Sequence, residues 1–201
     1  GRISGGSGGN RQQSGSDRMR EENDMNRIMP VFLAVVMLGA LCACHREPII
    51  IPDYPSATEQ YLFAKKQKET AFLAPSRDTK RKEQITAAIM AFERVIERYP
   101  DDLRVTPLAW MDLGDMYLHN KDYKEAVKNY ETVLQKYPDQ DDAVCKSLYG
   151  MGRAYDGLKD YEKALDYYKQ CFERFENDKN QLLAMLGRQA RQSYGRIRIK
   201  K

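Results

Sequence analysis

Two histidines and four cysteines are the residues of this 201-residue chain best suited to catalysis, metal binding or covalent attachment. His45 and His119 are far apart in the sequence, and neither belongs to a metal-ligand or acid–base motif. The chain also has no glycine-rich phosphate loop and no nucleophile spaced with a base. A solvent-facing position at a helix end is the simplest interpretation of His119. We therefore expect no catalytic residue, no metal site and no cofactor.

Two of the cysteines, Cys42 and Cys44, end an apolar segment that begins after a basic residue, Arg27. Residues 31–41 are about half as long as the ~20 apolar residues that a bilayer-spanning helix needs. Residues 25–43 are therefore predicted to be an export signal. Residues 1–24 are rich in Gly, Ser and charge, and are expected to be disordered or to lie upstream of the native start.

The sequence Leu41-Cys42-Ala43-Cys44 resembles the lipobox of bacterial lipoproteins, in which a leucine lies three residues before the acylated cysteine and a small residue directly before it. Cys44 fits this pattern better than Cys42. The resemblance implies cleavage after Ala43 and lipidation of Cys44, the alternatives being an ordinary signal peptide or an uncleaved anchor. Because His45 and not an aspartate follows, it also implies the outer membrane, with the folded part on the periplasmic face.

Residues 44–56 contain three prolines, which exclude a helix and favour an extended tether between the lipidated cysteine and the folded part. The isoleucines at 49–51 are unusual for a free linker. They are expected to lie either on the first helices or at the lipid surface.

The rest of the chain is dominated by an internal repeat, because the pattern of residues 107–140 returns 38 positions later in residues 145–176. Residues 57–100 form an earlier, degenerate unit, and residues 180–194 form one more first helix that would cap the array. The recurring positions are Trp110, Leu113, Gly114, Tyr117, Tyr123, Ala126, Tyr130, Tyr137 and Pro138, matched by Leu148, Met151, Gly152, Tyr155, Tyr161, Ala164, Tyr168, Phe175 and Glu176.

The spacing from Trp110 to Pro138 is similar to that of the tetratricopeptide repeat. The resemblance implies an all-α fold over residues 57–194, a tetratricopeptide-type α-solenoid of about three helical hairpins plus a C-terminal capping helix. Gly114 and Ala126 are expected where paired helices approach most closely. With the lipobox and the short tether, the layout resembles the BamD family of outer-membrane assembly lipoproteins, which has five hairpins.

The remaining two cysteines, Cys145 and Cys171, are a possible disulfide. In an antiparallel hairpin that sets Gly152 opposite Ala164, they also lie opposite each other. Helix axes about 8–10 Å apart would bring their Cα atoms near the 4.4–6.8 Å that a disulfide needs. An oxidising periplasm would permit the bond. The alternative is that Cys171 is a small buried residue and Cys145 a chance neighbour.

The first helices of such an array are expected to line a concave groove for a protein partner. Its surface would run from apolar to basic and suit a hydrophobic segment followed by acidic residues, although ordinary solvated side chains are the alternative. The basic tail at 195–201 is expected to be solvated, or to contact anionic lipid or an acidic partner. The predicted groove residues are Leu108, Met111, Asp115, Leu118, Lys146, Tyr149, Arg153, Arg188 and Arg191.

These features predict a non-enzymatic, membrane-anchored scaffold that binds another envelope protein, with outer-membrane protein assembly as the role that the resemblance implies. The alternatives are an accessory regulator of peptidoglycan enzymes and a pilotin-like targeting factor, since each would use the same groove. The net charge of +4 implies no strong field for nucleic acid, and no small-molecule substrate is expected.

Overall fold

The computed structural model describes residues 48–75 and 80–199. The leader, the signal peptide 25–43 and the lipidation residue Cys44 lie outside the described residues, so those predictions stay open. The helices all belong to one compact unit, Ile49–Lys201. None of the described helices is long and apolar enough to cross a membrane.

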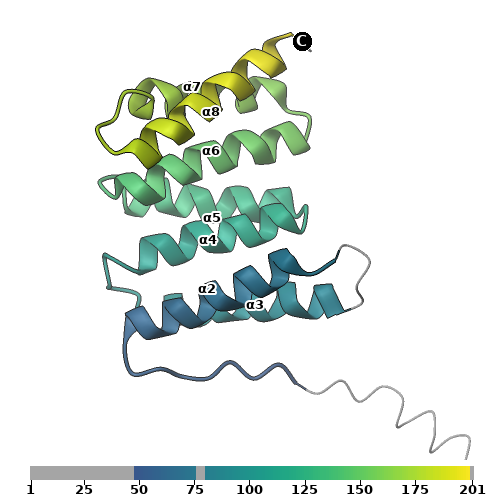
Figure 1. Cartoon of the computed structure of the whole chain (residues 1–201), viewed down its shortest axis with the longest axis vertical. Helices are drawn as coiled ribbons and strands as arrows, with labels where there is room; N and C mark the ends of the chain where they lie inside the picture. The colour runs from purple at the N-terminus through teal and green to yellow at the C-terminus, as the bar shows by residue number, and fades with distance from the viewer. Residues whose placement is uncertain (1–47, 76–79, 200–201) are drawn as a thin grey trace, which may run out of the picture. The chain divides into compact units, whose positions relative to one another are not determined.

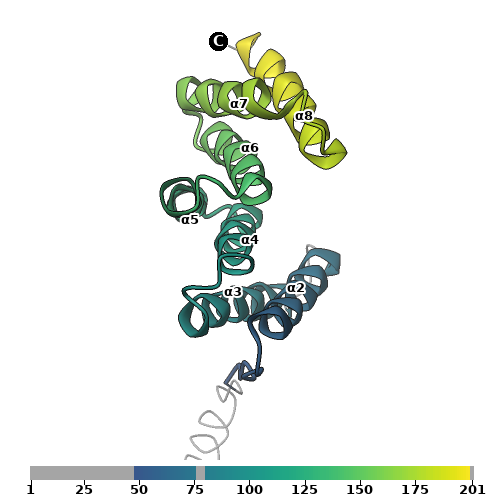
Figure 2. The ribbon, with the colours of Figure 1, turned by 90° about the vertical axis from the view of Figure 1, so that its left-hand side faces the viewer.

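The described part consists of seven helices and contains no strand. Consecutive helices pair as hairpins, α2 with α3, α4 with α5 and α6 with α7, and α8 packs on α6 and α7. Figure 1 shows the hairpins stacked in chain order, and Figure 2 shows α3, α5 and α7 on the side opposite α2 and α8. The predicted all-α solenoid of three hairpins plus a capping helix is confirmed. The helices are α2 (Ala57–Leu73), α3 (Lys80–Arg98), α4 (Thr106–His119), α5 (Tyr123–Lys136), α6 (Asp141–Gly157), α7 (Tyr161–Phe175) and α8 (Gln181–Arg198).

The turns inside the second and third hairpins have the same backbone conformation. Lys121 and Lys159 occupy the left-handed region, with φ of 68° and 63°. In each turn an aspartate amide, that of Asp122 or Asp160, donates to a carbonyl in the last turn of the preceding helix, at 2.9 and 3.0 Å. These bonds satisfy carbonyl groups that the helix end would otherwise leave unpaired. The chain reverses its direction within three residues, so the two helices run antiparallel.

The repeated glycines make room for tyrosine rings. A Cβ added to Gly114 would lie 2.6 Å from the ring of Tyr130, and one added to Gly150 would lie 2.4 Å from the same ring. Tyr130 of α5 is fully buried between these glycines of α4 and α6. Gly152 stands in the same relation to Tyr168, at 2.6 Å. We expected Gly114 to mark the closest approach of two helix backbones, but the space it leaves is filled by an aromatic side chain.

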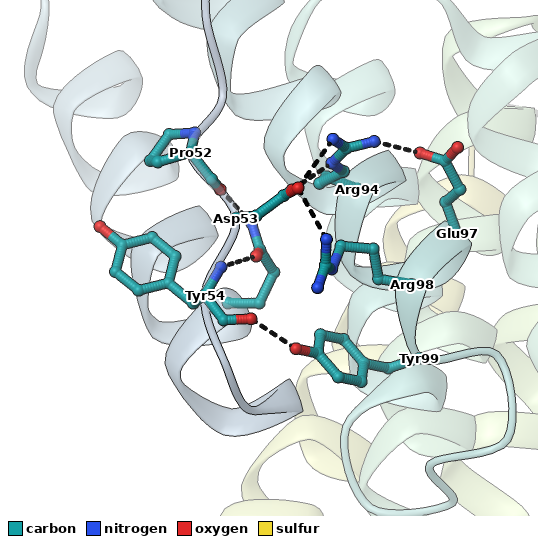
Figure 3. A network of polar contacts seen from close by, with 8 residues as sticks. Pro52, Asp53, Tyr54, Arg94, Glu97, Arg98 and Tyr99 are labelled. Atoms are coloured by element: carbon teal, nitrogen blue, oxygen red, sulfur yellow. Dashed lines mark hydrogen bonds and ion pairs between the residues drawn. The ribbon is translucent and has the colours of Figure 1, made fainter.

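The N-terminal residues 49–55 lie against the first hairpin, and we call them the strap. Buried Gln60 of α2 accepts from the Tyr54 amide at 2.8 Å and donates to the Pro52 carbonyl at 3.0 Å. Asp53 pairs with Arg94 and Arg98 of α3, both at 2.6 Å (Figure 3). The second half of the predicted tether 44–56 therefore packs against the first hairpin.

Burial bears on two smaller predictions about the chain ends. Of the three isoleucines, Ile51 packs on the first hairpin, whereas Ile50 is 81% exposed. The basic tail was predicted to begin at 195, but α8 continues to Arg198. This boundary was wrong because Ile197, seven residues after buried Ala190, returns to the same helix face and is itself fully buried.

Candidate functional site

A cavity of about 520 Å³ opens between α4, α6 and α8, and we call it the basin. Its walls come mainly from the C-terminal ends of α4 and α6 and from the second half of α8, so three successive first helices build it. The turn between α4 and α5 closes one side. The lining residues are Leu118, His119, Lys121, Tyr123, Tyr149, Arg153, Asp156, Gly157, Tyr168, Ser193 and Arg196.

The basin has more positive than negative charge. Its lining holds three basic side chains, Lys121, Arg153 and Arg196, and one carboxylate, Asp156. Asp156 pairs with Arg196 at 3.3 Å. Within the described part of the chain, Lys121 and Arg153 form no ion pair, and both are exposed. The lining can therefore attract an anionic group through these two cations.

His119 forms the end of the basin nearest α2. Its ring packs on Phe72 with the ring centroids 4.3 Å apart, and its Nε2 lies 2.6 Å from the guanidinium of Arg81. Arg81 can only donate, so Nε2 is the acceptor and the imidazole is neutral. Burial, together with the nearby charges of Arg81, Arg153 and Lys68, lowers the pKa of His119. His119 is thus a partly buried, neutral residue, not the solvent-facing one we expected.

Beside the basin, the acidic residues of α4 are paired with α2. Lys68 lies between Asp112 and Asp115, at 2.6 and 2.7 Å, and Asp112 is 5% exposed. The hydroxyls of Tyr61 and Tyr130 donate to the same two carboxylates, each at 2.7 Å. Burial alone would lower the pKa of Lys68, but Asp115 and Asp112 outweigh it and raise that pKa. These hydrogen-bonded carboxylates connect α2, α4 and α5.

A comparison with protein families matches two segments of the sequence to a known repeat. Tetratricopeptide-repeat models match residues 79–102, which include α3, and residues 105–177, which run from α4 to α7. Over these two segments the chain is similar to tetratricopeptide repeats. A comparison with curated proteins found no match to this sequence. Tetratricopeptide repeats are typically protein-binding scaffolds, so the basin on the first helices of the array is the candidate site for a protein partner.

The tetratricopeptide geometry brings only some of the predicted groove residues into the basin. Leu118, Tyr149 and Arg153 line it. Asp115 is held by Lys68 and Tyr130. Met111 is 1% exposed and part of the core, so its place in the groove was predicted wrongly. The two remaining residues from α4 and α6 lie outside the lining: Leu108 is half-buried against the core, and Lys146 is exposed.

The prediction for α8 was wrong. Arg191 pairs with Glu176 at the end of α7 and lies over the ring of Phe172, and Arg188 donates to the Glu176 carbonyl. Ser193 and Arg196 line the basin instead. Position 196 is five residues beyond 191, which turns it roughly 140° around the helix axis. The buried spacing of Ala190 and Ile197 was the sequence signal that could have set this orientation.

Cys145 and Cys171 are fully buried neighbours across the third hairpin. Both are free thiols in the structure. The Cys171 thiol lies 3.6 Å from the Cys145 carbonyl, and the Cys145 thiol lies 3.9 Å from the Leu183 carbonyl of α8. The hydrogen bond with Cys171, followed by burial, raises the pKa of Cys145. The disulfide stays a prediction, with its two residues placed side by side.

Proposed function

We propose that this chain is a membrane-anchored periplasmic scaffold that holds a segment of another envelope protein in the basin. The observation that carries the proposal is the basin itself, an open cavity of about 520 Å³ built by three successive first helices of a tetratricopeptide array. Two of its exposed polar side chains, Lys121 and Arg153, form no ion pair within the described part of the chain. Outer-membrane protein assembly is the envelope process that the resemblance to the BamD family supports.

The lipid anchor at Cys44 and the export signal at 25–43 belong to this proposal. Asp53 is fixed to α3 by Arg94 and Arg98. Nine residue steps separate it from Cys44, and an extended chain covers at most about 3.5 Å per step. A lipidated Cys44 would therefore hold the first hairpin within roughly 30 Å of the membrane surface. The three acyl chains of a mature lipoprotein are more than stable attachment requires.

The anchor is tested by replacing Cys44 with alanine and, as a matched control, Cys42 with alanine. We expect Cys44→Ala to abolish labelling with palmitate and to leave an unprocessed precursor, while Cys42→Ala is processed normally. Mass spectrometry and membrane fractionation provide the readout. Unchanged mass and fractionation of Cys44→Ala would reject the lipoprotein assignment without touching the fold.

Binding in the basin is tested by placing a photoreactive amino acid at Tyr149 in the full chain in cells. The control position is Lys128, an exposed residue of α5 that does not line the basin. We expect Tyr149, but not Lys128, to capture a defined envelope protein. A barrel-assembly protein supports the proposed process, whereas a cell-wall enzyme or a secretin or pilin would replace it with that partner's process. Equal capture from both positions, or none, contradicts the proposed scaffold.

A further inference from the structure

The charged side chains of the basin that have no ion-pair partner in the described part of the chain are both positive. At its α4 end, Lys121 and Arg153 face the cavity and have no carboxylate partner in the described part of the chain. His119 lies between these two residues and α2, and its Nε2 already accepts a hydrogen bond from Arg81. The nearby Asp115 is already shared by Lys68 and Tyr130. No acidic side chain of the lining neutralises this end of the basin.

A buried donor without a partner lies at the other end. Tyr168 has no exposed surface and lines the basin, and its hydroxyl makes no hydrogen bond within 3.5 Å, although Ser193 of α8 lies close enough to lower its pKa. Burial, followed by the neighbouring Tyr149 and Asp156, raises the pKa of Tyr168, so the hydroxyl keeps its proton. A buried hydroxyl without an acceptor costs free energy, and an incoming acceptor would recover it. A carboxylate is the strongest such acceptor that a protein partner can offer.

We propose that the basin selects an acidic segment of the partner protein, with carboxylates paired to Lys121 and Arg153 and one accepting from the Tyr168 hydroxyl. Tyr149 and Leu118 give the same cavity an apolar contact surface, so the segment would combine acidic with apolar side chains. This inference rests on the proposed scaffold function and adds the chemistry of the bound segment. Because the Tyr168 hydroxyl has no exposed surface, a lining side chain must turn aside before a carboxylate can reach it.

The test measures binding of two fluorescent peptides to the full chain in detergent. In one peptide leucine alternates with glutamate, and in the other glutamine replaces every glutamate. We expect the glutamate peptide to bind about tenfold more tightly, because a hydrogen bond to a charged group contributes roughly that factor. The preference should shrink as salt is added, since exposed charges are screened.

Variants assign the preference to the basin. The double variant Lys121→Gln/Arg153→Gln should lose about tenfold in affinity for the glutamate peptide. The control Lys128→Gln/Lys169→Gln removes the same charge from exposed positions on α5 and α7 and should bind like the parent. Tyr168→Phe keeps the ring and should lose a few-fold for the glutamate peptide and less for the glutamine peptide, whose amide carbonyl is a weaker acceptor. Circular dichroism melting checks that each variant is folded.

Three outcomes would overturn the inference: equal binding of both peptides, equal losses in the basin and control variants, or displacement of the glutamate peptide by vesicles of anionic lipid. Photocapture from Tyr149 separates these results from a failure of the scaffold proposal. If Tyr149 still captures its protein from the Lys121→Gln/Arg153→Gln variant with undiminished yield, the scaffold stands and the acidic segment is rejected. If Tyr149 captures nothing in the parent chain, the scaffold itself is rejected.

Discussion

Tyr130 occupies a space that glycines of two neighbouring helices leave open, and this contact sets the spacing between successive repeats. Gly114→Ala would put a methyl group 2.6 Å from a ring that is buried on all sides. Overpacking of this kind costs about 1–3 kcal/mol. We therefore expect Gly114→Ala to lower the free energy of unfolding in urea by that amount.

The control for this substitution is Gly195→Ala in α8. An added Cβ at Gly195 meets nothing within 4 Å. Because alanine favours a helix over glycine by up to about 1 kcal/mol, Gly195→Ala should be neutral or stabilising. If Gly114→Ala were as stable as Gly195→Ala, the tight packing of the Tyr130 ring would be refuted.

His119 should make the free energy of unfolding depend on pH. Its folded-state pKa is lowered by burial and by the nearby Arg81, Arg153 and Lys68. The unfolded state therefore binds a proton first as the pH falls through about 6.5, and the native state loses stability from there downward. His119→Asn, which keeps an acceptor for Arg81, should reduce the loss of unfolding free energy between neutral and mildly acidic pH. An unchanged pH dependence would show that His119 titrates normally.

At the scale of elements, the strap is held mainly by one buried side chain. Gln60 bonds both the Tyr54 amide and the Pro52 carbonyl away from water, whereas the Asp53 ion pairs are partly exposed. Exposed ion pairs contribute about 0–1 kcal/mol, and loss of a buried partner costs about 1–3 kcal/mol. Gln60→Ala should therefore release the strap more than Asp53→Asn, measured by hydrogen exchange at the Tyr54 amide. The reverse order would mean that the Asp53 pairs hold the strap.

The turn before α7 offers a stabilising substitution. Lys159 has a φ of 63°, a conformation that costs a side-chain-bearing residue about 1 kcal/mol relative to glycine. We expect Lys159→Gly to raise the free energy of unfolding by about that amount. Lys159→Val, which adds a β-branch at the same position, should lower it, and thermal melting would measure both. A destabilised glycine variant would contradict the left-handed turn.

The sequence predicted the helices from α4 to α7 because the pattern of α4 and α5 recurs 38 residues later in α6 and α7. The strap and the end of α8 have no second copy. Their positions depend on contacts that occur once in the chain, such as those of Gln60, Asp53 and buried Ile197, which no period predicts. The basin was predicted only in part for the same reason: Leu118, Tyr149 and Arg153 followed from the repeat, whereas Arg196 and Tyr168 depend on how α8 and α7 are turned.

At the scale of the whole folded unit, both ends of the stack are covered by the chain itself. The strap lies against the α2/α3 hairpin, and α8 packs on α6 and α7. An array closed in this way cannot be extended by another copy without displacing one of these segments. The basin lies on a face that neither end contact covers completely, the one where the first helices α4, α6 and α8 meet.

Hydrogen exchange of the full chain, with and without the protein captured at Tyr149, measures directly whether that protein is held in the basin. We expect a partner held in the basin to slow exchange at the ends of α4 and α6 and in the second half of α8, and to leave α5 and α7 unchanged. Protection confined to α5 and α7, or none in any helix, would contradict it.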